Sequence, residues 1–205
     1  MQSIILSRRG FREFDQIISL YTLEKGKQEV IARGVKKITS KNSPHLEPGS
    51  LVDIEIVSGK EIDHLTKVQP INYFVNIRTD LQKSLASTYI INLTDKLVHS
   101  GERDEKVFEL LKTWLEYINS NYFKSILIDA YIIVLLYCLG FDILDSNIDD
   151  EGIKKYLQIF STGNWEIINN LEITKQEYNK IHKKIYNYLV YQTERKVEDW
   201  DRINF

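Results

Sequence analysis

The apolar residues of this chain change their spacing once, near Pro70, and this change restricts the possible folds more than any other feature. Before Pro70, short runs rich in β-branched residues alternate with polar positions, most clearly over residues 52–56, which read Val-Asp-Ile-Glu-Ile. After it, apolar residues recur every three or four positions. A period of two indicates a half-buried strand, and a period near 3.6 indicates an amphipathic helix. The pattern therefore predicts an α+β chain, with a strand-rich domain over residues 1–73 and an all-helical domain over residues 74–205.

Five β-type runs fill the first of these domains. They are Ser3–Leu6, Gln16–Leu23, Gln28–Arg33, Leu51–Val57 and Ile62–Gln69. Gly26 predicts a hairpin between the second and third runs, and Ser58-Gly59 predicts a tight hairpin turn between the last two. Five short strands in a domain of this size are typical of a small closed barrel, so we predict a five-stranded OB-fold β-barrel.

Helix start signals divide the second domain. Helices are expected to begin at the Thr79–Gln82 capping box, at an Asp104 cap, at Tyr122, near Asp150, and at the Thr174–Glu177 capping box. The helix over Tyr122–Leu139 is apolar around most of its circumference, which indicates the centre of the domain, and Gly140 should end it. Asp129 lies inside this apolar helix and therefore needs a buried partner.

Several chemistries have no residues to support them. The chain has one cysteine, Cys138, and four scattered histidines, so neither a disulfide framework nor zinc-ligand spacing is present. It contains no glycine-rich phosphate loop and no Gly-x-Ser-x-Gly motif. Asp149, Asp150 and Glu151 are adjacent, and we interpret them as the charged start of a helix. The sequence thus predicts a protein without enzyme activity, cofactor or metal, and the lack of an export leader or membrane-length apolar run predicts a cytoplasmic protein that contacts no membrane.

Charge is distributed unevenly along the chain. The net charge is −2, but residues 1–41 hold nine basic and four acidic residues, a net of +5 that leaves −7 for the remainder. Such asymmetry is typical of a nucleic-acid-binding module joined to a neutral or acidic one. The alternative is that these residues are ordinary solvated loop charges in a lysine-rich chain. We expect phosphate contacts from Arg8, Arg9, Lys25, Lys27, Arg33, Lys36, Lys37 and Lys41.

The position of these basic residues suggests one groove. Arg8 and Arg9 are expected to follow the first strand, and the basic run from Arg33 to Lys37 is expected to follow the third, so both could border the same surface of a closed barrel. Three aromatic residues, Phe11, Phe14 and Tyr21, could offer faces on which unpaired bases stack. Because most aromatic side chains of barrels are buried, we assign all three to the core.

Six short segments of the chain form a recognisable series. They are residues 4–9 (IILSRR), 13–15 (EFD), 20–27 (LYTLEKGK), 32–37 (ARGVKK), 46–48 (LEP) and 135–141 (LLYCLGF). Together these segments resemble the RecO family. The order and spacing of these segments follow the family across most of the chain and weaken after Asp142. The chain departs from the family where many relatives have two Cys-x-x-Cys pairs after the Leu-Gly-aromatic segment, because it has residues 145–149 (DSNID) there. A zinc module is therefore expected to be absent or degenerated, and residues 142–175 are the segment that the resemblance explains least.

The resemblance implies a recombination mediator. A RecO-type protein would bind single-stranded DNA with its OB-fold, anneal complementary strands, and act in DNA repair and recombination with RecR and the SSB C-terminal tail, helping indirectly to load RecA. The C-terminal residues Glu198–Phe205 resemble the acidic, Phe-ending tails of SSB proteins and could compete with them, although a frayed terminal segment is the expected structure there.

Two other functions fit parts of the sequence. An adaptor would use the OB-fold to dock a protein partner and the basic loop to bind an acidic surface, without contacting DNA. A nuclease would need clustered carboxylates that hold two metal ions, and the basic domain lacks such a cluster. The mediator interpretation is preferred because the basic residues are clustered.

Overall fold

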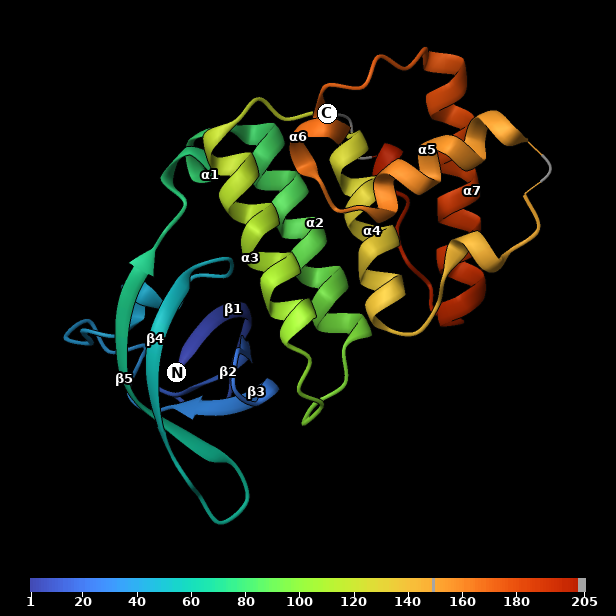
Figure 1. Ribbon diagram of the computed structural model, residues 1–205. Helices are drawn as coiled ribbons and strands as arrows, with labels where there is room; N and C mark the ends of the chain where they lie inside the picture. The colour runs from blue at the N-terminus through green and yellow to red at the C-terminus, as the bar shows by residue number, and fades with distance from the viewer. Residues whose placement is uncertain (149, 203–205) are drawn as a thin grey trace.

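The computed structural model describes residues 1–148 and 150–202, and it confirms the predicted α+β fold. A closed barrel of five strands, in the order β1-β2-β3-β5-β4, is followed by a group of helices. Figure 1 shows the barrel and the helices side by side, with α2 and α3 next to the barrel and α5 and α7 farthest from it. Asp149 and residues 203–205, which include the end of the proposed acidic tail, lie outside the described residues.

The barrel forms from the five predicted strands. They are β1 (Gln2–Gly10), β2 (Gln16–Thr22), β3 (Gly26–Ala32), β4 (Leu51–Val57) and β5 (Asp63–Asn72). Neighbouring strands are antiparallel except for β3 and β5, whose parallel pairing closes the barrel. Its interior is filled by a cluster of buried aliphatic side chains that includes Ile5, Ile18, Val30 and Ile54. Alternation along each strand places these residues inward.

Two details of the barrel differ from the sequence prediction. Strand β1 continues to Gly10, so Arg8 and Arg9 lie within the strand and do not follow it. Ser58-Gly59 does not form a tight turn, because the whole segment 58–62 separates β4 from β5 and the Asp63 carboxylate accepts a hydrogen bond from the Gly59 amide at 3.2 Å. The predicted hairpin at Gly26 is confirmed, and its φ of +68° is one that glycine adopts without strain.

Seven α-helices follow the barrel in the described part of the chain. They are α1 (Val75–Thr79), α2 (Leu81–Leu97), α3 (Glu105–Ser120), α4 (Ile126–Cys138), α5 (Glu151–Ser161), α6 (Trp165–Asn169) and α7 (Lys175–Thr193). The Asp104 cap and the Thr174–Glu177 capping box are confirmed. The cap of α2 is Asp80 and not Thr79, and α4 begins at Ile126, four residues later than predicted. Helices α1 and α6 were not predicted, because five residues are too few to show a helical period.

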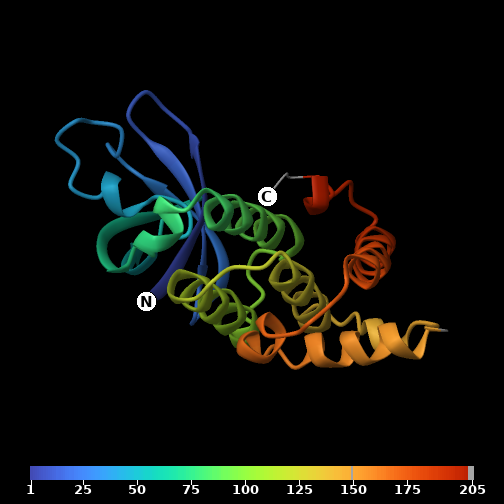
Figure 2. The same cartoon turned by 90° about the horizontal axis from the view of Figure 1, so that it is seen from above.

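Helix α4 is the centre of the helical part, as its apolar sequence predicted. Ten of its residues from Ile126 to Leu136 are buried, and helices α2, α3, α5, α6 and α7 all contact it. In Figure 2, α2 and α3 lie on the barrel side of α4, and α5 and α7 lie on its far side. Among the residues described, none of the helices has both the length and the apolar character that crossing a membrane requires.

The barrel and the helices share one apolar core. Ile4, Leu6 and Tyr21 from the outer side of the barrel belong to the same buried cluster as the helical residues Ile90 and Phe108. Because α2 packs directly on β1, one side of the barrel is covered, and its loops must reach solvent elsewhere. In Figure 2 the β1–β2 hairpin and the β3–β4 loop project from the end of the barrel that points away from the helices.

Candidate nucleic-acid interface

The β1–β2 loop (residues 11–15) and the first part of the β3–β4 loop (residues 33–41) form one unit at the free end of the barrel. The Lys36 amide donates to the Phe14 carbonyl at 3.0 Å, and the Gly34 amide donates to Asp15 Oδ1 at 2.8 Å. The Lys36 ammonium donates to the Arg12 carbonyl at 3.0 Å. These bonds hold a basic loop against a loop that carries two aromatic rings, and we call the combined surface the barrel tip.

Two phenylalanines of the barrel tip face solvent. Phe11 is 41% exposed and Phe14 is 43% exposed, so the prediction that they are core residues is wrong. The Arg12 guanidinium lies 5.0 Å from the centre of the Phe11 ring, and Lys37 Nζ lies 5.4 Å from the centre of the Phe14 ring. Each ring is thus paired with a cation, which is the arrangement that binds a stacked base together with its phosphate.

Tyr21, the third aromatic residue considered from the sequence, is a core residue as predicted. Its side chain is 1% exposed, and its hydroxyl donates to the Asp104 carbonyl at 2.9 Å. Burial raises the pKa of Tyr21 to about 12. The difference from Phe11 and Phe14 is one of position, since Tyr21 lies in a strand that α2 and α3 cover while the phenylalanines lie in a loop after Gly10.

The β4–β5 loop adds a third side to this surface. Lys60 from that loop, Arg12 and Phe11 from the β1–β2 loop, and Arg33 after β3 surround a hollow of about 310 Å³ above Ile31. Arg33 Nη2 lies 3.1 Å from His64 Nε2, which places the guanidinium across the start of β5. A hollow between these two loops and over strand β3 is where OB-folds bind oligonucleotides.

The structure brings together only part of the predicted basic set. Arg33, Lys36 and Lys37 are exposed at the barrel tip, and Lys41 is exposed further along the same loop. Arg9 lies on the outer face of β1, where it forms an ion pair with Glu29 at 3.0 Å. Lys25 is exposed in the β2–β3 turn, at the opposite end of β2 from the barrel tip. Arg12 and Lys60 were missing from the predicted set. They were not identified because both are far in the sequence from the basic run at residues 33–37.

Arg8 and Arg9 do not border one groove. Neighbouring residues of a strand point to opposite faces, and here Arg8 forms an ion pair with Glu47 at 2.7 Å while Arg9 pairs with Glu29. Lys27 also lies away from the predicted surface. Its side chain is 14% exposed, and its ammonium forms an ion pair with Asp95 of α2 at 2.9 Å, so the structure gives it a protein partner in place of a phosphate.

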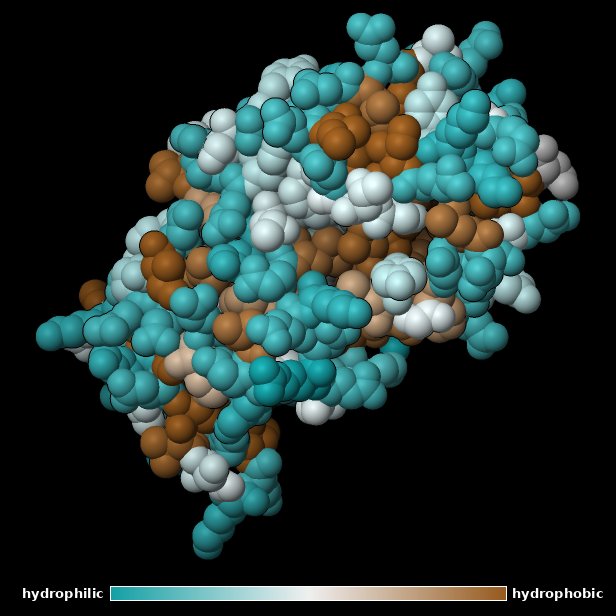
Figure 3. Space-filling model, in the orientation of Figure 1, coloured by the Kyte–Doolittle hydropathy of each residue, from teal (hydrophilic) through white to brown (hydrophobic). Residues whose placement is uncertain are grey.

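The described residues contain no group of side chains that could bind a metal ion. No three His, Cys, Asp or Glu side chains within residues 1–148 and 150–202 are grouped as metal ligands would be. The face of the molecule in Figure 3 is largely hydrophilic, with smaller hydrophobic patches over both the barrel and the helices. Among the described residues, the two contacts between a cation and an aromatic ring, Arg12 with Phe11 and Lys37 with Phe14, both lie at the barrel tip.

A closed five-stranded barrel joined through a shared core to a helical domain defines the class of OB-fold proteins that carry an appended helical domain. Comparison with known families assigns both parts of the chain to one family. Residues 1–74 match the family described as Recombination protein O N terminal, and residues 78–143 match Recombination protein O C terminal. Together these matches cover more than half of the chain. The chain belongs to the RecO family, as the resemblance of its segments predicted.

Curated relatives carry the name DNA repair protein RecO. The protein of Desulforamulus reducens is 32% identical over 118 residues, which are 58% of this chain and 46% of the relative. The protein of Roseiflexus sp. is 29% identical over 140 residues, which are 68% of this chain and 49% of the relative. The match thus spans about half the length of these two relatives. The protein of Caldanaerobacter subterraneus subsp. tengcongensis is 25% identical over an alignment of 206 positions, which covers 99% of this chain and 83% of the relative.

Proposed function

We propose that this protein binds single-stranded DNA at the barrel tip and anneals complementary strands in DNA repair. The observation that carries the proposal is the pairing of Phe11 with Arg12 and of Phe14 with Lys37 on an exposed surface. Phosphates would be neutralised by Arg33, Lys36 and Lys37, which releases counterions, while bases stack on the rings without sequence readout. Base pairing between the two strands would then supply the specificity.

Annealing needs no covalent step, so the proposed function is that of a mediator and not of an enzyme. Membership of the RecO family supports RecR, the SSB C-terminal tail and, indirectly, RecA as partners in recombination, and supports a cytoplasmic place of action at the nucleoid. Nucleotide hydrolysis is not part of the proposal, because the sequence lacks a phosphate-binding loop.

The proposal is tested by fluorescence anisotropy of a labelled oligothymidine across a salt series. The Arg33/Lys36/Lys37 triple alanine variant should bind more weakly, and its slope of log affinity against log salt should be shallower by roughly 0.7 for each phosphate that is no longer neutralised, about two in all. The matched control replaces Lys175, Lys180 and Lys183 by alanine. These three lysines are exposed on α7, and their replacement removes the same charge as the triple variant of the barrel tip. It should leave the slope near that of the wild type.

The aromatic contribution is separated by the Phe11/Phe14 double alanine variant. It should lose affinity by about 1–3 kcal/mol for each stacked base, with the salt slope unchanged, because stacking releases no counterions. If the triple and the double alanine variants both bind DNA with the affinity of the wild type, the barrel tip is not the DNA-binding site. No binding of DNA by the wild type at low salt would favour the adaptor function, in which the same cations bind an acidic protein surface.

A further inference from the structure

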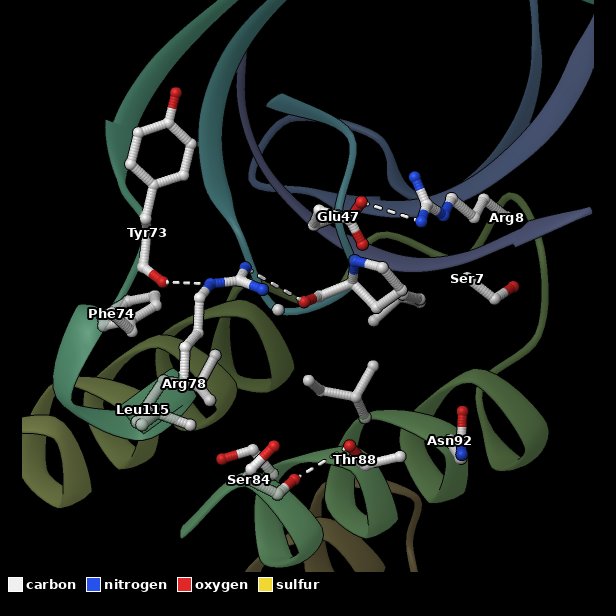
Figure 4. Close-up of a pocket in the computed structure, with 16 residues that line it drawn as sticks. Ser7, Arg8, Glu47, Tyr73, Phe74, Arg78, Ser84, Thr88, Asn92 and Leu115 are labelled. Atoms are coloured by element: carbon white, nitrogen blue, oxygen red, sulfur yellow. Dashed lines mark hydrogen bonds and ion pairs between the residues drawn. The ribbon is translucent and has the colours of Figure 1, made fainter. Parts of the chain in front are cut away.

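Arg8 points into a cleft between the barrel and the helices that is separate from the barrel tip. The cleft has a volume of about 360 Å³ and lies between β1, the end of the β3–β4 loop and helices α1 and α2 (Figure 4). We call it the interdomain cleft. Arg9, the next residue along β1, faces the opposite side of the sheet, where it pairs with Glu29. Strand β1 therefore presents one arginine to each of two surfaces.

The interdomain cleft combines an apolar floor with a polar rim. Leu6, Phe74, Ile77 and Ile91 line it and are all buried, while Ser84, Thr88 and Asn92 line it from α2 with hydroxyl and amide groups. Two guanidinium groups, from Arg8 and Arg78, and one carboxylate, from Glu47, complete the lining, which gives a net charge of +1. A flat apolar surface beside a cation and hydrogen-bonding groups suits a nucleobase that carries a phosphate.

The two arginines have different roles in the cleft. Arg78 is fixed to the barrel, because its Nε donates to the Tyr73 carbonyl at 2.7 Å and its Nη2 donates to Ser50 Oγ at 2.9 Å. Arg8 bonds to Glu47 through Nη2, and its side chain is 34% exposed. Its remaining N–H groups can therefore reach a ligand in the cleft, whereas Arg78 holds the walls of the cleft in place.

The backbone at the cleft is held in a strained conformation. Phe74, which caps α1 and lines the cleft, has φ 52° and ψ 59°, a left-handed conformation that a bulky residue rarely adopts. Its amide donates to Asn72 Oδ1 at 2.8 Å, and its side chain is 2% exposed. Strain of this kind persists where the surrounding structure fixes it, and it clusters at ligand sites. The junction of the two domains is thus preorganised around the cleft.

We propose that the interdomain cleft binds one nucleotide of a second DNA strand, with the base on the apolar floor and the phosphate at Arg8. This inference rests on the proposed function: a protein that holds two strands at once brings complementary sequences together, and the barrel tip accounts for one of them. The cleft and the hollow at the barrel tip share no lining residue, so the two strands would occupy separate surfaces of the protein. Glu47 competes with the phosphate for Arg8, and its carboxylate limits the affinity of this site.

Photocrosslinking with oligothymidine that contains 4-thiothymidine tests the second site in the full chain. At saturating oligonucleotide, mass spectrometry should map one set of crosslinks to the barrel tip and a second set to residues 73–92. Ser84→Trp fills the cleft from α2 and should abolish the second set only. Gln82→Trp is the matched control, because Gln82 is exposed on the same helix and does not line the cleft. It should retain both sets.

A variant that is expected to raise the yield of cleft crosslinks keeps the test independent of folding defects, because misfolding would lower that yield. Glu47→Gln removes the competing carboxylate and should raise the yield of cleft crosslinks severalfold, whereas Arg8→Gln should lower it and Arg8→Lys should restore it in part. Crosslinks confined to the barrel tip in the wild type would overturn the second site and leave the proposed function intact. Cleft crosslinks that Ser84→Trp and Gln82→Trp change equally would also overturn it. An absence of crosslinks at both places would contradict the proposed function itself.

Discussion

Lys27 of strand β3 and Asp95 of helix α2 form an ion pair of 2.9 Å that joins the barrel to the helices. The same carboxylate accepts hydrogen bonds from Ser7 at 2.8 Å and from Ser19 at 2.6 Å, so three strands are bonded to one side chain of α2. Burial acts to raise the pKa of Asp95, but the bonds from Ser19, Lys27 and Ser7 outweigh it and hold the pKa below its ordinary value. Asp95 is therefore charged in the folded protein and fixes the orientation of β1.

Replacing Asp95 by Asn should destabilise the protein by about 2 kcal/mol, because it leaves the Lys27 ammonium poorly paired in a part-buried position. The free energy of unfolding in urea measures this. Glu55→Gln breaks the exposed Lys67–Glu55 pair of 3.0 Å and should change the stability by less than about 0.5 kcal/mol. An Asp95→Asn variant as stable as Glu55→Gln would contradict the role of the pair.

The same pair predicts a loss of stability in acid. A carboxyl group whose pKa is lower in the folded state stabilises the protein above its unfolded pKa, and this contribution is lost as the pH falls through the folded pKa. The wild type should therefore approach the stability of Asp95→Asn as the pH falls below about 4. Urea unfolding of both proteins at pH 7 and at pH 3.5 measures the difference, and a difference that does not shrink would argue against a lowered pKa.

His182 predicts a second pH dependence, of opposite sign. It lies between two carboxylates, with Nδ1 at 3.2 Å from Asp129 of α4 and Nε2 at 2.9 Å from Asp199 of the C-terminal segment. This contact supplies the partner that the sequence required for Asp129. Burial acts to lower the pKa of His182, but the two carboxylates outweigh it and raise the pKa. The imidazolium therefore ties the C-terminal segment to the helices.

A raised histidine pKa gives stability that is fully present below the unfolded pKa, near 6.5, and is lost as the pH rises through the folded pKa. The wild type should thus be more stable than His182→Gln at pH 6, and the difference should narrow by pH 9. Urea unfolding of the two proteins at both pH values measures it. A constant difference would show that His182 acts through packing alone, with Tyr178 and Tyr186 stacked on its two sides.

Trp200 anchors the C-terminal segment in the core. Its side chain is fully buried, with ring centres 4.5 Å from His182 and 5.7 Å from Tyr89 of α2. The expectation of a frayed segment from Glu198 onward is therefore wrong for Trp200. Trp200→Ala should cost about 3–5 kcal/mol of unfolding free energy. Tyr191→Ala, at a side chain that is 77% exposed, should cost less than about 1 kcal/mol, and equal effects would contradict the anchoring role.

The sequence predicted the long elements because their periods repeat often enough to be counted. The five strands and the helices that became α2, α3, α4, α5 and α7 all have such a period. The direction of Arg8 was not predictable in the same way. A bulge between Ile5 and Ser7 shifts the register of β1 against β2, so the faces of Arg8 and Arg9 depend on an irregularity that alternation does not reveal.

The candidate site was predictable only where it is continuous in the sequence. The run from Arg33 to Lys37 was identified because its charges are adjacent, whereas Arg12 and Lys60 reach the same hollow from two other loops. Lys27 was misplaced for a related reason, since its partner Asp95 is 68 residues away and no local pattern connects them. Tertiary interactions of this range decide which charges are free for a ligand.

Gly26 lies where the β2–β3 hairpin of the barrel approaches the loop between α2 and α3 closely enough to exclude a side chain. A Cβ atom at Gly26 would lie 1.9 Å from the Glu102 carbonyl oxygen, in the loop between α2 and α3, and its φ is +68°. Gly101 has a similar φ of +82°, but a Cβ there would meet nothing within 4 Å. The two glycines therefore share the conformational requirement and differ only in the close approach of a neighbouring backbone.

Gly101→Ala should cost roughly 1 kcal/mol, which is the strain of a left-handed alanine. Gly26→Ala should cost at least twice as much, because the β2–β3 hairpin must also move away from the α2–α3 loop and so disturb the neighbouring Lys27–Asp95 pair. Urea unfolding of the two variants compares them directly. Equal reductions in stability would mean that the hairpin and the loop separate without cost, and that the shared apolar core alone holds the barrel to the helices.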